Sequence, residues 1–371
     1  MKKNLLFIAD KPDWAYEFMI KTWVPYLQEN YNCYIAFQQD FAIKPNKTYF
    51  GLKKSIYNFL KRISLRFGKS TKVYQVSENS NYLYPIFKVP PVYQYDKDLN
   101  KIKSNISHFD LITEMAFYFQ YIAEFPFKSP KKIVGIFTDK FPHDGPNFDI
   151  KKNTDRNLLS REDFYNEYLK SYQHIIVGGG NLLNNYRELT DKVDFVYGIY
   201  GQNNFVENEN VGRKKSMTIG WTGTPDRPMK GFRTIIEPAI ENVKNTGRDV
   251  LLKTKFSGAY EDLYTFYSDV DCVVIASDAD SGPSMYAEAC LSSVPVISTK
   301  VGLPLSFLSE GVNGVFIERT IDDLEKAIID LYDNREKLAE FSKNTRKDYL
   351  KIMDNDITVL HFIKILKQYG L

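Results

Sequence analysis

Two carboxylates eight residues apart, Asp280 and Glu288, are the residues of this sequence whose types and spacing point most directly to chemistry. Asp280 lies in a turn of small residues that follows an apolar run, 272–276, and Glu288 lies on the first turns of a helix expected to begin near Ser284. The free N–H groups and positive dipole end of such a helix favour phosphate. The arrangement suits a diphosphate between two hydroxyl-rich ends, which describes a nucleotide sugar.

A second turn carries cations suited to the same diphosphate. Residues 217–232 are typical of a strand, a glycine-containing turn and a helix start, with Gly223, Arg227 and Lys230 in the turn. Glycine lets backbone N–H groups approach phosphate, and a nearby cation neutralises its charge. We expect Lys230 to bind the donor rather than to be a solvated side chain. For Arg227 the sequence leaves both readings open.

The segment around Asp280 resembles the retaining GT-B glycosyltransferases of family 4, also called glycosyl transferases group 1. Their signature is Glu-x7-Glu in a strand–turn–helix, followed by a strand containing Pro-Val-Ile. This chain has Asp280-x7-Glu288 and then Pro295-Val296-Ile297, so its first acid is one methylene shorter. The alternative reading is an ordinary βαβ crossover in which Glu288 is a solvated helix residue.

The resemblance extends to the second turn, where the family has Gly-Arg and Lys-Gly on the donor diphosphate. Lys230-Gly231 matches, whereas Thr224 stands at the Arg position, so Arg227 would supply the missing charge. The resemblance implies that Asp280 contacts the transferring sugar and that Glu288 holds the ribose hydroxyls. The other residues of the two turns predicted to bind the donor are Gly223, Thr224, Ser281, Gly282, Pro283 and Ser284.

The implied reaction is a retaining transfer from a nucleotide-sugar donor to a glycan or lipid-linked acceptor, in bacterial surface polysaccharide or glycoconjugate synthesis. Lys230 and the helix N–H groups would stabilise the departing diphosphate, so no cofactor and no obligatory metal are expected. Three Asp-x-Asp strings occur, but their context is not that of metal-dependent transferases. A nucleotide-sugar epimerase or hydrolase on the same fold, and a catalytically silent sugar-nucleotide-binding subunit, are the alternatives.

Alternating strands and helices must position these residues. In the first half of the chain, strands are predicted at 5–9, 33–37, 111–112, 132–137 and 174–177, and helices at 15–29 and 161–172. After a polar linker at 206–215, strands are predicted at 217–221, 250–252, 272–276, 295–301 and 315–317, and helices at 321–334 and 335–350. This alternation predicts an α/β protein.

The resemblance implies the GT-B fold: two Rossmann-like doubly wound domains that face an interdomain cleft. We expect an N-terminal acceptor-binding domain at 1–200 and a nucleotide-sugar-binding domain at 201–353. Residues 354–371 form a predicted amphipathic helix that starts at Asp354-Asn-Asp356 and, by resemblance, crosses back onto the N-terminal domain.

Acceptor-side signals in the N-terminal half are weaker. Many family members have a glycine-rich turn after the first strand and a His after the fourth, where this chain has Asp10 and Glu114. Glu114, a predicted catalytic residue, and Asp139 end strand-like runs, and the open-sheet rule turns such ends toward the crevice. His143 lies close to Asp139 in the sequence. For each of these residues, loop polarity without function is the alternative.

The overall composition is that of a globular protein of 371 residues with 43% hydrophobic residues and a net charge of +3. This nearly neutral charge argues against nucleic-acid binding. The absence of a long apolar run predicts a cytoplasmic protein. Residues 53–72 hold seven cations and no acid, with apolar residues at helical spacing. They predict a basic amphipathic helix that contacts an anionic membrane surface, on the inner face of the membrane, or lies solvated on its domain.

Overall fold

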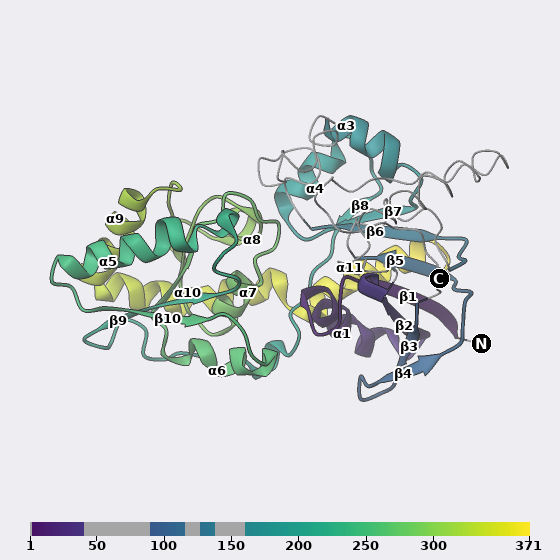
Figure 1. Cartoon of the computed structure of the whole chain (residues 1–371), viewed down its shortest axis with the longest axis horizontal. Coiled ribbons are helices and arrows are strands. Elements are labelled where there is room, and N and C mark those ends of the chain that lie inside the picture. Colours follow the sequence, from purple (N-terminus) through teal and green to yellow (C-terminus); the bar gives the residue numbers. More distant parts are fainter. Residues whose placement is uncertain (1, 41–89, 116–126, 138–159) are drawn as a thin grey trace, which may run out of the picture. The chain divides into compact units, whose positions relative to one another are not determined.

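The computed structural model describes residues 2–40, 90–115, 127–137 and 160–371 (Figure 1). The predicted basic helix at 53–72 and the candidates Asp139 and His143 lie outside the described residues. The described chain forms two compact units. One holds 2–40, 90–115, 127–136, 160–175 and 369–371, and the other holds Phe137 and 176–368.

The first half of the chain builds an eight-stranded sheet with the strand order β4-β3-β2-β1-β5-β6-β7-β8. The pairs β1–β2, β1–β5 and β5–β6 are parallel. Its strands are β1 (Lys3–Ala9), β2 (Tyr31–Phe37), β3 (Val92–Tyr95), β4 (Lys101–Ser104), β5 (Leu111–Glu114), β6 (Lys132–Ile136), β7 (His174–Val177) and β8 (Val193–Phe195). Its helices are α1 (Ala15–Leu27), α3 (Arg161–Phe164), which continues as a π-helical turn (Tyr165–Leu169), and α4 (Gly180–Arg187).

An antiparallel hairpin, β3–β4, occupies one edge of this sheet, a feature that the predicted strands did not include. The turn between its strands is short, and strands joined by a short turn must run antiparallel. The Asp96 side chain accepts hydrogen bonds from the backbone N–H groups of Asp98 and Asn100, at 2.9 and 2.8 Å, and so closes the turn. Strand β4 has a single apolar residue and no buried one, so it lacks the apolar run by which strands were predicted elsewhere in the chain.

The second half builds a five-stranded parallel sheet with the order β10-β9-β11-β12-β13. Its strands are β9 (Met217–Thr222), β10 (Val250–Lys255), β11 (Cys272–Ile275), β12 (Val296–Ser298) and β13 (Gly314–Phe316). Its helices are α5 (Glu237–Asn245), which follows a π-helical turn (Phe232–Ile236), α6 (Leu263–Phe266), α7 (Ser284–Leu291), α8 (Gly302–Phe307), α9 (Ile321–Asp333), α10 (Arg335–Met353) and α11 (Asn355–Gln368). Short helical turns lie at 38–40, 202–204, 228–230, 260–262 and 267–269.

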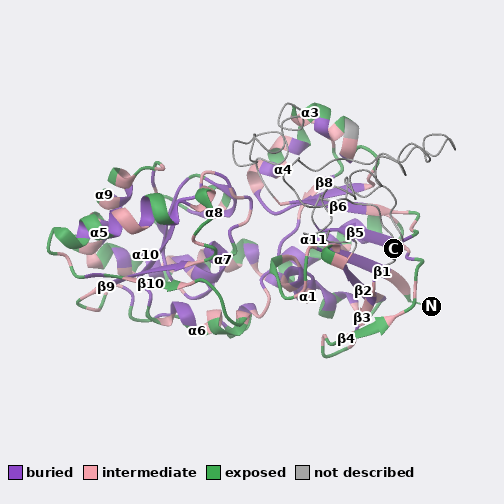
Figure 2. Ribbon diagram, viewed as in Figure 1, coloured by how far each residue is buried: buried purple, intermediate pink, exposed green. Residues whose placement is uncertain are grey.

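The central strands of both sheets are buried, whereas the edge strand β4 is partly exposed (Figure 2). In β1 and β11 the apolar side chains are buried on both faces, as expected for strands inside a doubly wound sheet. Helix α7 buries every residue from Met285 to Leu291. Because this helix is buried on all sides, a polar side chain on it must find its partners inside the protein.

The predicted helix start at Asp354 is present. Oδ1 of Asp354 accepts from the backbone N–H of Asp356 at 2.8 Å, and α11 begins at Asn355. Helix α11 contacts β8, where Nδ1 of His361 lies 3.1 Å from the carbonyl of Phe195. It therefore lies against the end strand of the sheet that the first half of the chain builds. Among the described residues, no helix combines the length and apolar character needed to cross a membrane.

Candidate active site

Lys230 and Asp280 form an ion pair at the carboxyl edge of the five-stranded sheet. Lys230 ends the turn after β9, and Asp280 lies in the turn after β11. Strands β9 and β11 are neighbours, although the chain passes through β10 on the other side of β9 between them. The strand order therefore reverses at this point, and open α/β sheets bind ligands outside the carboxyl ends of their strands at such a switch point.

The backbone holds these two turns together beside the ion pair. The N–H of Asp278 donates to the carbonyl of Met229 at 2.9 Å. Gly231 has φ +67°, and a Cβ there would lie 2.6 Å from the carbonyl oxygen of Ala276, so the close approach of the turns requires glycine. The position of Lys230 relative to Asp280 is thus set by the main chain.

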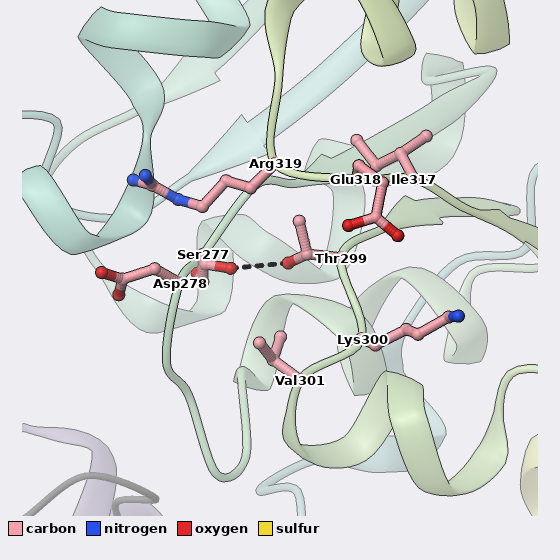
Figure 3. Close-up of a pocket in the computed structure, with 8 residues that line it drawn as sticks. All are labelled: Ser277, Asp278, Thr299, Lys300, Val301, Ile317, Glu318 and Arg319. Atoms are coloured by element: carbon pink, nitrogen blue, oxygen red, sulfur yellow. Dashed lines mark hydrogen bonds between the residues drawn. The ribbon is translucent and has the colours of Figure 1, made fainter. Parts of the chain in front are cut away.

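Arg319, which follows β13, donates hydrogen bonds to both of these turns. Its Nε donates to the carbonyl of Ala276 at 2.9 Å and its Nη2 to the carbonyl of Pro228 at 3.0 Å. Arg319 also lines a pocket of about 290 Å³ at the carboxyl ends of β11, β12 and β13 (Figure 3). The other lining residues are Ser277, Asp278, Thr299, Lys300, Val301, Ile317 and Glu318. In this pocket Oγ1 of Thr299 donates to the carbonyl of Ser277 at 2.6 Å.

Helix α7 begins beside Asp280 with Pro283 as its N-cap. Proline has no N–H, so the N–H groups available to an anion are those of the next residues, beginning with the exposed Ser284. Ser281, by contrast, is fully buried, and its Oγ has no hydrogen-bond partner among the described residues. Gly302, with φ +41°, packs against the carbonyl of Ser281, which a Cβ would approach to 2.2 Å. The Ser281 side chain is therefore internal, whereas Ser284 is an exposed residue whose side chain bonds Glu288.

Glu288 is only 1% exposed, which excludes the reading of a solvated helix residue. Its Oε2 accepts a hydrogen bond from the hydroxyl of Tyr267 at 2.7 Å. Burial raises the pKa of Glu288, and hydrogen bonds from Tyr267 and Ser284 oppose that rise. The carboxylate therefore lies inside the sheet–helix layer, held by hydroxyl groups.

The remaining donor-side residues, Gly223, Thr224 and Arg227, are exposed. Gly223 has φ +135° and donates its N–H to the carbonyl of Lys255 at 3.1 Å. Nη2 of Arg227 lies 3.2 Å from Sδ of Met229, so its guanidinium rests on the turn that carries Lys230. The structure thus groups Lys230, Asp280 and the α7 N-terminus directly, with Arg227 beside them on the surface.

The N-terminal candidates Asp10 and Glu114 lie at the carboxyl ends of β1 and β5, the switch point of the first sheet. Asp10 follows β1, Glu114 ends β5, and β1 separates β2 from β5. Glu114 is 1% exposed, accepts from the hydroxyl of Tyr172 at 2.8 Å, and has its pKa raised to about 7 by burial. Burial also raises the pKa of Asp10, whose Oδ1 is buried without a hydrogen-bond partner in the described chain.

Two residues that hold the site, Tyr267 and Arg319, were not predicted from the sequence. Tyr267 lies 21 residues before Glu288, and Arg319 lies 91 residues after Pro228, so spacing gives no signal for either contact. In the part of the chain that the structure describes, no three His, Cys, Asp or Glu residues are grouped so as to hold a metal ion.

Comparison with known proteins supports the fold. Residues 243–348 match the family described as Glycosyl transferases group 1, and no curated protein matches the sequence. A TarM variant from S. aureus, in complex with fondaparinux, alpha-GlcNAc-glycerol and UDP, is 14% identical with a TM-score of 0.61, over 98% of this chain and 99% of that chain. Sucrose-phosphate synthase from Thermosynechococcus elongatus is 11% identical with a TM-score of 0.60, over 100% and 99%.

HepE from Anabaena, in complex with UDP and glucose, is 12% identical with a TM-score of 0.60, over 98% of this chain and 99% of that chain. Three glycosyltransferase structures thus match the whole chain although few residues are shared. The chain therefore has the GT-B fold, as predicted.

Proposed function

We propose that this protein is a glycosyltransferase that moves a sugar from a nucleotide-sugar donor to a glycan or lipid-linked acceptor. The observation that carries the proposal is the Lys230–Asp280 ion pair at the switch point of the five-stranded sheet, beside the N-terminus of α7. A cation, free helix N–H groups and a carboxylate together match a ligand with a diphosphate joined to a sugar. The match of residues 243–348 to glycosyl transferases group 1 supports the same class.

The donor diphosphate would take the place of Asp280 as the partner of Lys230. It brings more negative charge than a carboxylate, and the N–H groups at the start of α7 would add further hydrogen bonds. Asp280 would then be free to accept hydrogen bonds from hydroxyls of the transferring sugar. Glu288, one helical turn further along α7, would accept from the ribose hydroxyls of the nucleotide.

In the proposed retaining reaction, the bond between C1 of the sugar and the diphosphate oxygen breaks. The acceptor hydroxyl oxygen bonds to C1 on the same face, and its proton passes to the departing diphosphate. Negative charge on the diphosphate grows as the bond breaks, so Lys230 binds the transition state more strongly than the bound donor. Because Lys230 would stabilise the charge that develops on the diphosphate, the arrangement supports a reaction that needs no metal.

TarM, crystallised with alpha-GlcNAc-glycerol and UDP, and HepE, crystallised with UDP-glucose, are GT-B proteins that bind such ligands. They support a uridine nucleotide as the first donor to test and a glycan-like acceptor. A lipid-linked acceptor would place the enzyme at the inner face of a membrane, where the predicted basic helix at 53–72 would supply the contact. Glu114 and Asp10 are the acceptor-side candidates of the other unit.

A thermal-shift screen against UDP, GDP, dTDP, ADP and their sugars, followed by product analysis, tests the proposal. Stabilisation by one nucleotide and transfer of its sugar to an added acceptor is the expected result. An altered or hydrolysed donor without acceptor would instead identify an epimerase or hydrolase. Binding without turnover would identify a catalytically silent subunit, and no binding of any nucleotide would overturn the proposal.

A further inference from the structure

The hydroxyl of Tyr267 lies between the end of β9 and the buried carboxylate of Glu288. It donates to Oε2 of Glu288 at 2.7 Å, and its oxygen lies 3.3 Å from Oγ1 of Thr222. A phenol has one proton, and Tyr267 gives it to the carboxylate, so Thr222 is the donor in the second bond. The three side chains therefore form a directed chain of hydrogen bonds from Thr222 through Tyr267 to Glu288.

This chain joins the two segments that build the donor side of the site. Thr222 is the last residue of β9 and directly precedes Gly223, whereas Glu288 lies on α7. The N–H of Thr222 also lies 3.1 Å from Sδ of Met285, one helical turn before Glu288. The Tyr267 ring is fully buried, so its hydroxyl has a fixed position. The end of β9 thus contacts both the hydroxyl that bonds Glu288 and the helix that carries Glu288.

The Tyr267 hydroxyl acts on Glu288 in two ways. Burial favours the neutral form of a carboxyl group, whereas a donated hydrogen bond favours the carboxylate. The carboxylate accepts hydrogen bonds more strongly than the protonated group, whose own O–H would need an acceptor in this buried site. The same bond fixes the rotation of the carboxyl group and so the direction in which its remaining lone pairs point.

We propose that Tyr267 is a positioning residue of the donor site, which orients Glu288 to receive the ribose hydroxyls of the nucleotide. This inference rests on the proposed function, since it assumes a nucleotide donor. Thr222 takes part as the donor that fixes the Tyr267 hydroxyl. Tyr267 itself need not touch the donor.

The other titratable groups that face Glu288 are tyrosines: Tyr260 before α6, Tyr197 after β8 and Tyr349 on α10. Burial raises the pKa of each phenol, so all three stay uncharged at neutral and acid pH. Of the groups in this cluster, Glu288 is the one expected to change charge on mild acidification.

The experiment compares Tyr267→Phe with wild type by titration calorimetry, using UDP and 2′-deoxy-UDP as probes, or GDP or ADP with its deoxy form if one of these binds tighter. Removing the hydroxyl should weaken binding of the ribonucleotide about tenfold, the effect of one hydrogen bond to a charged group. Binding of the deoxynucleotide should change less, because one ribose contact of Glu288 is already absent. The preference for ribose over deoxyribose should therefore fall in the variant.

Acidification gives a second readout that loss of packing would not move. Without the Tyr267 hydrogen bond, the pKa of Glu288 rises further, so the variant should lose nucleotide affinity at a higher pH than wild type. Tyr286→Phe is the matched control, because Tyr286 is a buried tyrosine on α7 whose hydroxyl pairs with Cys290 instead. The control should keep the ribose preference and the pH profile of wild type.

Equal weakening of both nucleotides by Tyr267→Phe, with an unchanged pH profile, would overturn the inference and leave the proposed function standing. A wild type that binds none of the nucleotides would overturn the proposed function itself. If Tyr267→Phe does not fold, Thr222→Val tests the same chain from its other end. It should shift the ribose preference in the same direction by a smaller factor, and an unchanged preference would overturn the inference.

Discussion

Lys230 and Asp280 form an ion pair although 50 residues separate them in the chain. Their side chains are 23% and 13% exposed, so the pair is partly shielded from water but still reachable by a ligand. The two turns are kept in this arrangement by the backbone hydrogen bond from Asp278 to Met229 and by the hydrogen bonds of the Arg319 side chain. A diphosphate that enters here meets a cation that the fold has already placed, and orientation of that kind lowers the barrier to reaction.

Lys230→Ala is predicted to lower turnover more than donor affinity. The charge on the departing diphosphate grows toward the transition state, so kcat should fall by roughly two to three orders of magnitude while the donor Kd rises much less. Steady-state kinetics and calorimetry measure the two effects. Lys326→Ala, which removes a lysine with a 77% exposed side chain, should leave both unchanged. Equal losses in turnover and affinity would mean that Lys230 binds ground and transition states alike.

Glu288→Gln is predicted to weaken nucleotide-donor binding by about tenfold or more. Glutamine keeps the shape of this buried residue and can still accept from Tyr267, so the fold should survive while the charge is lost. Titration calorimetry checks the affinity, and the melting temperature checks the fold. Glu340→Gln on α10, where the acid is exposed, serves as the control. Unchanged donor affinity would show that Glu288 does not hold the ribose.

Arg319→Ala is predicted to lower both stability and turnover. It removes the Arg319 donors from the carbonyls of Ala276 and Pro228, of which that of Pro228 keeps the N–H of Gly231. The loss is about 1–3 kcal/mol in the free energy of unfolding, and the substitution frees the turn that carries Lys230. Urea unfolding and kcat measure the two effects. Arg233→Ala removes an exposed arginine of the same region that pairs with Glu237, and should lower stability much less, because solvent screens that pair. If the two variants behave alike, Arg319 does not hold the site.

Glu114→Gln is predicted to change how stability depends on pH. Burial raises the pKa of Glu114 from 4.5 to about 7, so folding favours its protonated form. The resulting stabilisation is complete below the pKa of Glu114 in the unfolded chain, 4.5, and it is lost as pH rises through the pKa in the folded protein. The loss therefore falls between pH 4.5 and about 7. It amounts to about 3 kcal/mol at most. Urea midpoints at pH 5 and pH 8 should differ less in the variant than in wild type. The same difference in both proteins would contradict the assignment.

EDTA is predicted to leave transferase activity unchanged. Lys230 and the N–H groups at the start of α7 would neutralise the diphosphate, which is the task that a metal ion performs in metal-dependent transferases. Activity is measured with and without the chelator, and after addition of Mg²⁺ or Mn²⁺. Loss of activity with EDTA and its return with either metal would overturn the metal-independent mechanism.

Most of the strands that carry the site were predicted from the sequence, because doubly buried strands are continuous apolar runs. The strand predicted at 295–301 is an instructive difference, since β12 spans only Val296–Ser298. The next residue, Thr299, still donates its N–H to the carbonyl of Ile275, and its hydroxyl bonds the carbonyl of Ser277 in the pocket. The predicted strand ran on to Val301 because that residue is also apolar and buried, but Val301 directly precedes α8 and is not part of the sheet. Hydrophobicity reports burial, and it does not report whether backbone groups are paired in a sheet.

By itself the sequence determined which residue types stand at the ends of strands and at the starts of helices. Those local features predicted Lys230, Asp280 and Glu288 as candidates, and the α/β alternation that places them at a sheet edge. Tertiary structure alone decided that Lys230 pairs with Asp280, that Glu288 is buried under Tyr267, and that Arg319 supports both turns. These contacts depend on strand order and on residues 21 to 91 positions apart, which spacing along the chain does not encode.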